Sequence, residues 1–187
     1  AEVIPHLWER NPEEARRQLQ TLGRLTQGAQ AEMRTLLMEL RPTALTETGL
    51  ETLFGHLGRA AAARADVEDD LDLEESPQLP PDVKLALYRI AQEALNNVAK
   101  HARADRVTLR LHRNSELKTG VAIEIKDDGC GFDMGAVSGD HFGLRTMRER
   151  AEVIGAAINI ESKSGAGTTI SVRWEPDENQ ERTRGDR

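Results

Sequence analysis

The chain has 187 residues, a formal net charge of −7, 3% aromatic residues and a single cysteine, Cys130. One domain with a short attachment can bury a core at this length, and the lone cysteine excludes an intrachain disulfide framework and fits a reducing compartment. The acidic balance argues against nucleic acid as a partner, because such partners select for basic patches. No apolar run approaches the ~18 residues of a membrane helix, and no signal peptide is recognisable. Since the sequence begins at Ala1 without Met, we expect a cytoplasmic part of a longer protein, with or without a membrane anchor elsewhere.

A long amphipathic helix is predicted first. Asn11-Pro12-Glu13-Glu14 has a capping residue, a proline suited to the first helical position and two acids that favour the positive end of the helix dipole. Apolar residues then recur at helical spacing: Leu19, Leu22, Leu25, Ala29, Met33, Leu36, Leu37 and Leu40. So long a helix with a narrow apolar seam is expected to pair with a partner helix; a long core helix of one domain is the alternative. Pro42 then ends it.

The rest of the chain alternates between helical and strand patterns. The predicted helices cover residues 50–65, 88–101 and 144–154, and the predicted strands cover residues 67–73, 107–113, 121–126, 157–161 and 168–174. The second and third strands alternate in phase, so they should pair antiparallel. We therefore predict an α+β two-layer sandwich, a mixed sheet covered by helices, preceded by the long helix. The predicted boundaries are 1–42 for the helical region, 43–175 for the sandwich and 176–187 for a disordered polar tail.

The helix at 88–101 carries the first candidate site. Its apolar stripe would face a core: Leu87, Ile90, Ala91, Ala94, Leu95 and Val98. Glu93 and Asn97 lie four residues apart and therefore point the same way. A carboxylate and an amide oxygen on one face can hold a hydrated Mg²⁺ and orient a phosphate-bearing ligand. The alternative, a pair of solvated polar residues, is the commoner situation on helices.

A second candidate follows the strand at 121–126. In Asp127-Asp128-Gly129-Cys130-Gly131 the first carboxylate stands at a strand end, where it can accept a hydrogen bond from an exocyclic amine such as that of adenine. The glycines allow the backbone to approach a flat ring closely. A glycine-rich turn with a solvated acid is the alternative.

The start of the helix at 144–154 is the third candidate. Phe142-Gly143-Leu144-Arg145 opens this helix at a glycine, where free N–H groups and the dipole suit a phosphate chain. Residues 134–141 are rich in glycine and polar side chains, as expected of a mobile lid. An ordinary helix start is the alternative.

Other kinds of site find less support. The glycine pairs at 129–131 and 165–167 lack the third glycine of a dinucleotide fingerprint, and no Walker-type Gly-Lys-Ser/Thr occurs. The five histidines are scattered without ligand spacing, so a histidine metal centre is not favoured. A Ser/His/Asp hydrolase has no Gly-x-Ser-x-Gly elbow here.

Taken in order, these pieces resemble the ATP-binding domain (Bergerat fold) of the GHKL superfamily, which covers sensor histidine kinases, type II topoisomerases, Hsp90 chaperones and MutL. The matching segments are 93–101 (the N box), 127–131 and 143–144 (the glycine boxes) and 165–169 (the closing motif). The finer resemblance is to histidine kinases that pair with NarL/LuxR-type response regulators, whose patterns EALxNxxKHA and GLxxMxERA match residues 93–102 and 143–151. The resemblance covers residues 12–175.

The resemblance implies ATP and Mg²⁺ as cofactors and assigns roles at the base and the metal. Asn97 would ligate the Mg²⁺ that bridges the triphosphate. Asp127 would bind the adenine amine, with Gly129 and Gly131 shaping the floor beneath the ring.

The same resemblance assigns the remaining contacts. Lys100 and His101 would reach the phosphates or the ribose, and Gly143 and Leu144 would border the phosphates. Thr168 would support the hydrogen-bond network of Asp127.

Glu93 corresponds to the acid that activates water in the ATPases of this superfamily. In the kinase subgroup it would instead assist the phosphoryl acceptor or a water in the second shell of the metal. Two rival functions follow: an ATP-hydrolysing protein of the chaperone or topoisomerase kind with Glu93 as general base, and a module that dimerises without nucleotide.

The long helix would be the second helix of a dimerisation hairpin, ending in Leu40-Arg41-Pro42 as the subgroup commonly does. In such kinases the phosphoacceptor histidine lies on the first helix and is followed by an acid. No histidine here precedes Asp or Glu. We therefore expect the acceptor helix to lie outside this chain, the isolated chain not to autophosphorylate, and the full-length protein to be a homodimer that serves a response regulator.

Overall fold

The computed structural model describes residues 11–19, 22–23, 26, 33, 47–113, 120–134 and 142–176. Residues 12–19 are helical, and the backbone N–H of Glu14 donates to Asn11 Oδ1 at 3.3 Å, as the predicted cap requires. Residues 22, 23, 26 and 33 are helical too. Most of the predicted long helix, the turn at 114–119, the predicted lid at 134–141 except for Met134, and the tail from 177 lie outside the described residues.

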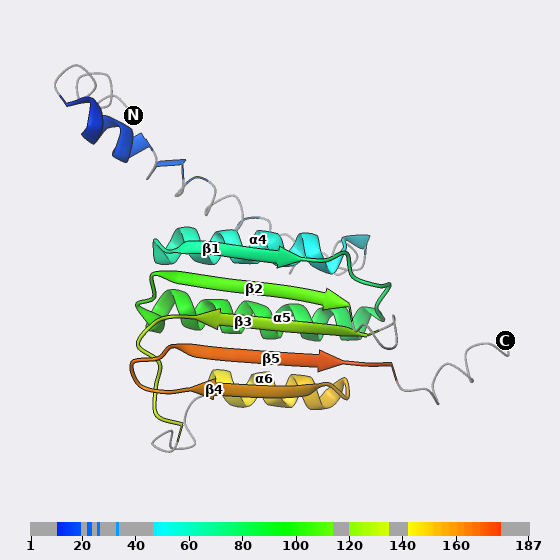
Figure 1. The fold of residues 1–187 in the computed structure, drawn as a ribbon. Helices are drawn as coiled ribbons and strands as arrows, with labels where there is room; N and C mark the ends of the chain where they lie inside the picture. Colours follow the sequence, from blue (N-terminus) through cyan, green and yellow to red (C-terminus); the bar gives the residue numbers. More distant parts are fainter. Residues whose placement is uncertain are drawn as a thin grey trace, which may run out of the picture.

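From residue 47 onward the described chain forms a five-stranded mixed sheet with helices on one face (Figure 1). The strands are β1 (Glu68–Leu73), β2 (Arg106–Arg113), β3 (Val121–Asp127), β4 (Ala157–Ser162) and β5 (Thr168–Trp174), in the order β1-β2-β3-β5-β4. The helices are α4 (Leu50–Ala65), α5 (Pro81–Asn97) and α6 (Phe142–Val153), and a π-helical turn η1 (Val98–Ala102) extends α5. The predicted two-layer α+β sandwich is confirmed.

Strand pairing places the chemistry at one end of the sheet. β1 pairs parallel with β2, whereas β2–β3, β3–β5 and β5–β4 are antiparallel. Asp127, the last residue of β3, lies opposite Thr168, the first residue of β5. Because β3 ends where β5 begins, both residues lie at the same end of the sheet, beside the loop that follows Asp127.

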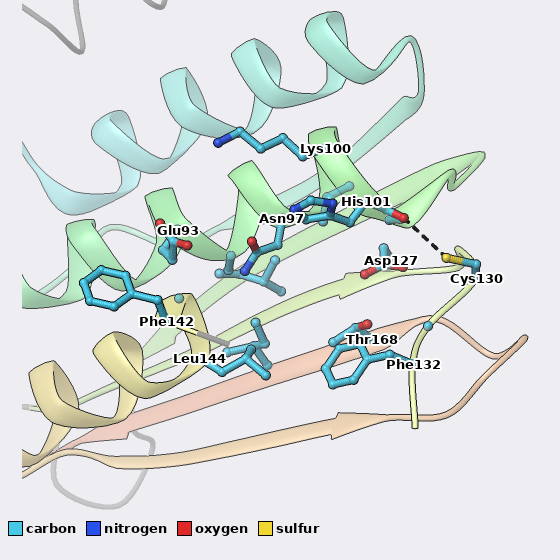
Figure 2. Close-up of a pocket in the computed structure, with 17 residues that line it drawn as sticks. Glu93, Asn97, Lys100, His101, Asp127, Cys130, Phe132, Phe142, Leu144 and Thr168 are labelled. Atoms are coloured by element: carbon cyan, nitrogen blue, oxygen red, sulfur yellow. Dashed lines mark hydrogen bonds between the residues drawn. The ribbon is translucent and has the colours of Figure 1, made fainter. Parts of the chain in front are cut away.

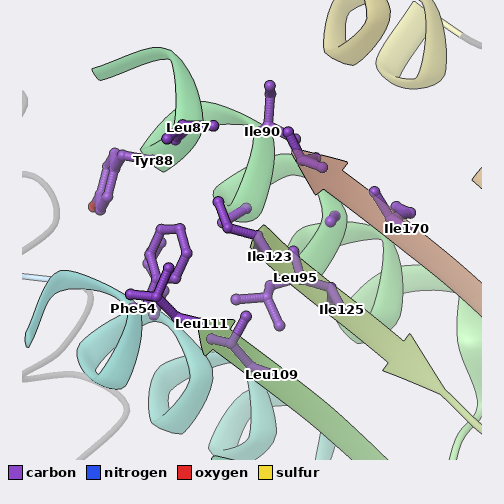
Figure 3. Close-up of a cluster of buried hydrophobic side chains, with 14 of the residues drawn as sticks. Phe54, Leu87, Tyr88, Ile90, Leu95, Leu109, Leu111, Ile123, Ile125 and Ile170 are labelled. Carbon is purple, nitrogen blue, oxygen red and sulfur yellow. The ribbon is translucent and has the colours of Figure 1, made fainter. Parts of the chain in front are cut away.

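The core lies between the sheet and the helices. Every residue of the predicted apolar stripe on α5 is buried, from Leu87 to Val98. Figure 3 shows side chains from both layers meeting: Phe54, Leu87, Tyr88, Ile90, Leu95, Leu109, Leu111, Ile123, Ile125 and Ile170. Each fully buried aliphatic side chain contributes about 1.5–3 kcal/mol relative to exposure. This packing fixes α5 against β2 and β3, and with it the direction in which Glu93 and Asn97 point.

Helix α5 differs from its prediction at both ends. It begins at Pro81 rather than near Tyr88, because a proline suits the first helical position and Asp82 adds an acid in the first turn. Lys84 is buried close to this start and donates from Nζ to the Thr48 carbonyl at 2.8 Å. At the other end the α-helix stops at Asn97 and continues as the π turn. Among the described helices, none has the length and apolar character to span a bilayer.

Candidate nucleotide-binding site

A cavity of about 580 Å³ opens between α5, η1, the start of α6 and the end of the sheet (Figure 2). Its size lies within the range usual for small-molecule sites. Its lining is Glu93, Ala94, Asn97, Val98, Lys100, His101, Ala102, Ile125, Asp127, Cys130, Gly131, Phe132, Phe142, Gly143, Leu144, Thr168 and Ile170. Nine of the ten site residues predicted from sequence are in this set, and Gly129 is not. Segments far apart in the chain therefore meet at one cavity.

Asp127 supplies a buried hydrogen-bond acceptor. Its carboxylate is held by the backbone N–H of Gly129, which donates to Oδ1 at 2.9 Å. Burial raises the pKa of Asp127 above its usual value; hydrogen bonds from the N–H groups of Gly129 and Thr168 oppose the shift, and the negative charge of Asp128 adds to it. A buried acceptor in a fixed orientation suits an exocyclic amine of a flat base.

Gly129 lies beside the cavity and does not belong to its lining. A Cβ at Gly129 would overlap the carbonyl oxygen of Ala102, and the next residue, Cys130, donates its backbone N–H to that same oxygen at 2.7 Å. The glycine is needed where the loop packs on the end of η1. Gly131 does line the cavity; its φ is +54°, and a Cβ there would overlap the carbonyl oxygens of Lys163 and Gly167. Gly129 thus anchors the loop, and Gly131 lies under the cavity.

The π-helical turn shapes the opposite wall. Backbone bonds from i to i+5 widen the helix here, and such turns recur at functional sites. Lys100 and His101 of this turn line the cavity, next to Asn97 at the end of α5. The His101 carbonyl accepts a hydrogen bond from the Cys130 thiol at 3.3 Å. Figure 2 shows the exposed Lys100 side chain extending away from Asp127, so Lys100 lies at the rim.

The start of α6 forms the end of the cavity distant from Asp127 (Figure 2). Glu93 lies against Gly143 so closely that a Cβ there would overlap its Oε1. Phe142 is 70% exposed, and the Arg145 guanidinium lies 5.6 Å from its ring centroid. Arg145 also pairs with Glu149, Nε to Oε1 at 3.4 Å. The first turn of α6, whose N–H groups have no partner within the helix, therefore lies beside an acid, Glu93, and an exposed ring.

These residues fit ATP with Mg²⁺. Among the described residues no cluster of three or more His, Cys, Asp or Glu side chains is placed to hold a metal. A cation held largely by phosphate and water oxygens would need only one or two protein oxygens, and Asn97, which lines the cavity, has an amide oxygen to offer. The buried acceptor at Asp127 and the helix start at Gly143 suit the base and the phosphates of the same ligand.

Eight lining residues carried no predicted site role, and two of them, Cys130 and Phe132, lie in the loop that faces the base end. Both belong to the loop after β3, immediately before and after Gly131. An aromatic residue next to a glycine box was the available signal for Phe132, since a ring can stack on a base. Cys130 gave no signal of its own.

Comparisons with known proteins agree with this geometry. A family model described as "Histidine kinase-, DNA gyrase B-, and HSP90-like ATPase" matches residues 82–178, and one described as "Histidine kinase" matches residues 1–45. An uncharacterized sensor-like histidine kinase of Chloroflexus aurantiacus is 36% identical over 181 residues, covering 92% of this chain and 30% of its own length. Sensor histidine kinase LiaS of Bacillus subtilis is 33% identical over 172 residues, covering 91% and 46%. The chain thus spans less than half the length of these relatives.

Among solved structures, the histidine kinase domain of the Erythrobacter litoralis EL346 blue-light activated histidine kinase has a similar fold. Its TM-score is 0.55 at 23% sequence identity, covering 72% of this chain and 65% of that domain. This likeness confirms the expected GHKL fold. With the matched family models and the curated relatives, the chain belongs to the histidine kinase-, DNA gyrase B- and HSP90-like ATPase family, and within it to the sensor histidine kinases.

Proposed function

We propose that this chain is the ATP-binding catalytic part of a two-component sensor kinase. It transfers the γ-phosphoryl group of ATP to a histidine outside these 187 residues, for relay to a response regulator. The observation that carries the proposal is the shared cavity: a buried carboxylate, Asp127, at one end, and Asn97 with the start of α6 toward the other.

At the base end, Asp127 accepts a hydrogen bond from the 6-amino group of adenine. A base with an oxygen at that position would place two acceptors together, so the carboxylate rejects it. Gly131 lets the ring lie close to the backbone, and Phe132 offers an aromatic side chain nearby. The base is thereby oriented before the phosphates are engaged.

At the phosphate end, Asn97 Oδ1 is the metal ligand. A Mg²⁺ ion held there would supply positive charge to neutralise the charge that builds on the phosphate oxygens. The N–H groups at Gly143 and Leu144 contact phosphate oxygens at the positive end of α6. Lys100 and His101 add donors to the phosphates or the ribose. Catalysis in this arrangement is mostly positioning and charge neutralisation.

Glu93 assists the incoming acceptor or a water on the metal. It lines the cavity beside Phe142 and Gly143, distant from Asp127, where the γ-phosphoryl group would lie. The same place also favours a second function, ATP hydrolysis with Glu93 as general base. Steady ATP turnover by this chain that Glu93→Gln abolishes would establish hydrolysis instead.

The remaining assignments follow the same kinase subgroup. Residues 1–42 form part of a dimerisation hairpin, residues 43–175 the catalytic domain and residues 176–187 a tail. The full-length protein is a homodimer in the cytoplasm or on its membrane, and a NarL/LuxR-type regulator is its partner. Analytical ultracentrifugation of the full-length protein tests the dimer, and phosphotransfer to regulators of that type tests the partner.

Titration calorimetry with ATP or ADP and Mg²⁺ tests nucleotide binding. The unmutated chain should bind, and Asp127→Ala or Asn97→Ala should lose most of the affinity. Asp69→Ala, an acid-to-alanine change on β1 away from the cavity, is the matched control and should bind normally. Absence of binding heat for the unmutated chain would refute the proposal and favour a module that dimerises without nucleotide.

A phosphorylation assay tests the missing acceptor. The isolated chain with γ-labelled ATP should gain no acid-labile label, because no histidine in the sequence is followed by an acid. A separate segment carrying the acceptor histidine should become labelled in its presence. Stable acid-labile label on the isolated chain would contradict this expectation.

A further inference from the structure

Ser162, the last residue of β4, joins three backbone segments next to the base end of the cavity. Its Oγ accepts the backbone N–H of Phe132 at 2.9 Å, donates to the Gly167 carbonyl at 3.0 Å and lies 3.0 Å from Thr168 Oγ1. Phe132 and Thr168 both line the cavity, whereas Ser162 does not touch it. Ser162 therefore acts on a ligand through its neighbours.

The direction of the Ser162–Thr168 bond follows from proton counting. A serine hydroxyl has one proton and two lone pairs. The proton of Ser162 is directed to the Gly167 carbonyl, and one lone pair accepts from Phe132. A second lone pair remains, so Thr168 must be the donor in the 3.0 Å contact. The proton of Thr168 thus turns toward Ser162, and its free lone pairs are left for the cavity.

We propose that Ser162 is a positioning residue for base selection: by engaging the Thr168 proton, it leaves two acceptors, Thr168 Oγ1 and the Asp127 carboxylate, facing the base. Asp127 and Thr168 are cross-strand neighbours, so the two acceptors act at one place. Together they select a purine with a hydrogen-bond donor at position 6 and reject one with an oxygen there. This inference rests on the proposed adenine nucleotide site and adds a residue that sets its selectivity.

Removing the Ser162 hydroxyl releases the Thr168 proton. In Ser162→Ala that proton can turn into the cavity and donate to a 6-oxo group, while the Phe132 N–H loses its acceptor. Affinity for ATP should fall about threefold to tenfold, the range for one hydrogen bond. The preference for ATP over ITP, which differs at position 6, should narrow by about tenfold. Loss of stability alone would weaken both nucleotides equally and leave that ratio unchanged.

The experiment measures ATP and ITP binding by calorimetry for five variants, Ser162→Ala among them, beside the unmutated chain. Ser162→Thr keeps a hydroxyl and should keep the ATP/ITP ratio within about twofold. Ser164→Ala, an exposed serine two residues on, is the matched control and should change neither affinity. Thr168→Val removes the group through which Ser162 acts and should narrow the ratio. Adding Ser162→Ala to Thr168→Val should narrow it no further.

The outcomes distinguish a failure of the role proposed for Ser162 from a failure of the proposed nucleotide site. An unchanged ratio in Ser162→Ala or in Thr168→Val would overturn the role of Ser162, even with ATP binding intact in the unmutated chain. Additive narrowing in the double variant would overturn the route through Thr168. If Ser162→Ala does not fold, Thr168→Val and Ser162→Thr still give the two opposite results that the inference requires. Failure of the unmutated chain to bind ATP would instead refute the proposed function.

Discussion

The two ends of the cavity are built differently. At the base end, Asp127 and Thr168 belong to paired strands and their side chains already have hydrogen-bond partners, Gly129 for one and Ser162 for the other. At the phosphate end, the side chains of Glu93, Asn97 and Lys100 make no hydrogen bond to other residues in the part of the chain that the structure describes. One end is preorganised, and the other presents side chains that a ligand would order.

This difference divides the work of binding. A preorganised acceptor binds the base with little loss of conformational entropy, so the base end supplies affinity and selectivity. The phosphate end must order longer side chains around a highly charged group, and it depends on a cation to do so. Changes at the base end should therefore weaken every adenine nucleotide, whereas changes at the phosphate end should act only where phosphate and metal are present.

Asp127→Asn should cause the largest loss of nucleotide affinity. The amide keeps the shape of the side chain but puts a donor where the adenine amine needs an acceptor. Affinity for ATP, ADP and AMP should each fall by about 100-fold, the effect expected when a charge-assisted hydrogen bond is lost and a buried polar group is left unpaired. Calorimetry with the three nucleotides measures this. A loss for ATP alone would contradict the division between the two ends.

Asn97→Ala should have a smaller effect that depends on the metal. Loss of one oxygen ligand should weaken ATP binding by about 10- to 100-fold in excess Mg²⁺, the range for changes around a metal site. In EDTA the variant and the unmutated chain should bind ATP equally, because no metal links Asn97 to the phosphates. AMP should bind both proteins alike. An equal loss with and without Mg²⁺ would assign Asn97 to packing instead.

The raised pKa of Asp127 predicts a stability effect that depends on pH. Burial raises the pKa of the folded carboxyl above its unfolded value, so the folded state holds its proton to higher pH. This contribution to stability is present below the unfolded pKa of about 3.9 and is lost as pH rises through the folded pKa. Without nucleotide, Asp127→Asn should therefore melt above the unmutated chain at pH 7.

Melting curves at several pH values test the sign. The gap between Asp127→Asn and the unmutated chain should close as pH falls below the unfolded pKa of about 3.9, where the carboxyl is protonated in both the folded and the unfolded state. Comparing the two proteins at each pH removes the opposite effects of Glu74 and Asp128, whose pKa values are lowered by hydrogen bonds. If the difference in melting temperature instead widens toward low pH, burial does not raise the pKa of Asp127.

Much of the fold could be predicted because the responsible signals are local. The apolar stripe of α5 and the alternation in β2 and β3 predict which side chains face the core. In the structure these side chains are buried, and β2 and β3 pair antiparallel as expected. The resemblance to the GHKL domain, based on the motifs around Glu93, Asp127 and Gly143, then predicted the site residues, nine of which line one cavity. The helices and strands follow from periodicity in the sequence, whereas the site residues follow from that resemblance.

Three features could not be predicted because they depend on contacts between distant segments. The π-helical turn at 98–102 has no periodic signature distinct from the end of an α-helix. The need for glycine at 129 arises from the Ala102 carbonyl, which is set by how η1 meets the loop. In the sequence, Ser162 is an ordinary polar residue at a strand end. Its role follows from its hydrogen bond to the Gly167 carbonyl, which only the folded turn brings close. Each becomes visible only when the partner segment is in place.

The smallest expected effect is a change in the alkylation rate of the single cysteine, Cys130. Its thiol reports on the boundary between the two ends of the cavity. Cys130 is exposed, lines the cavity and donates its thiol proton to the His101 carbonyl, so it lies between the base loop and the π turn. Saturating ATP should slow its alkylation by iodoacetamide several-fold, because a bound base covers the loop. AMP should protect nearly as well, since protection depends on the base end. Mass spectrometry of the labelled chain measures the rates, and protection by inorganic triphosphate but not by AMP would place the thiol at the phosphate end instead.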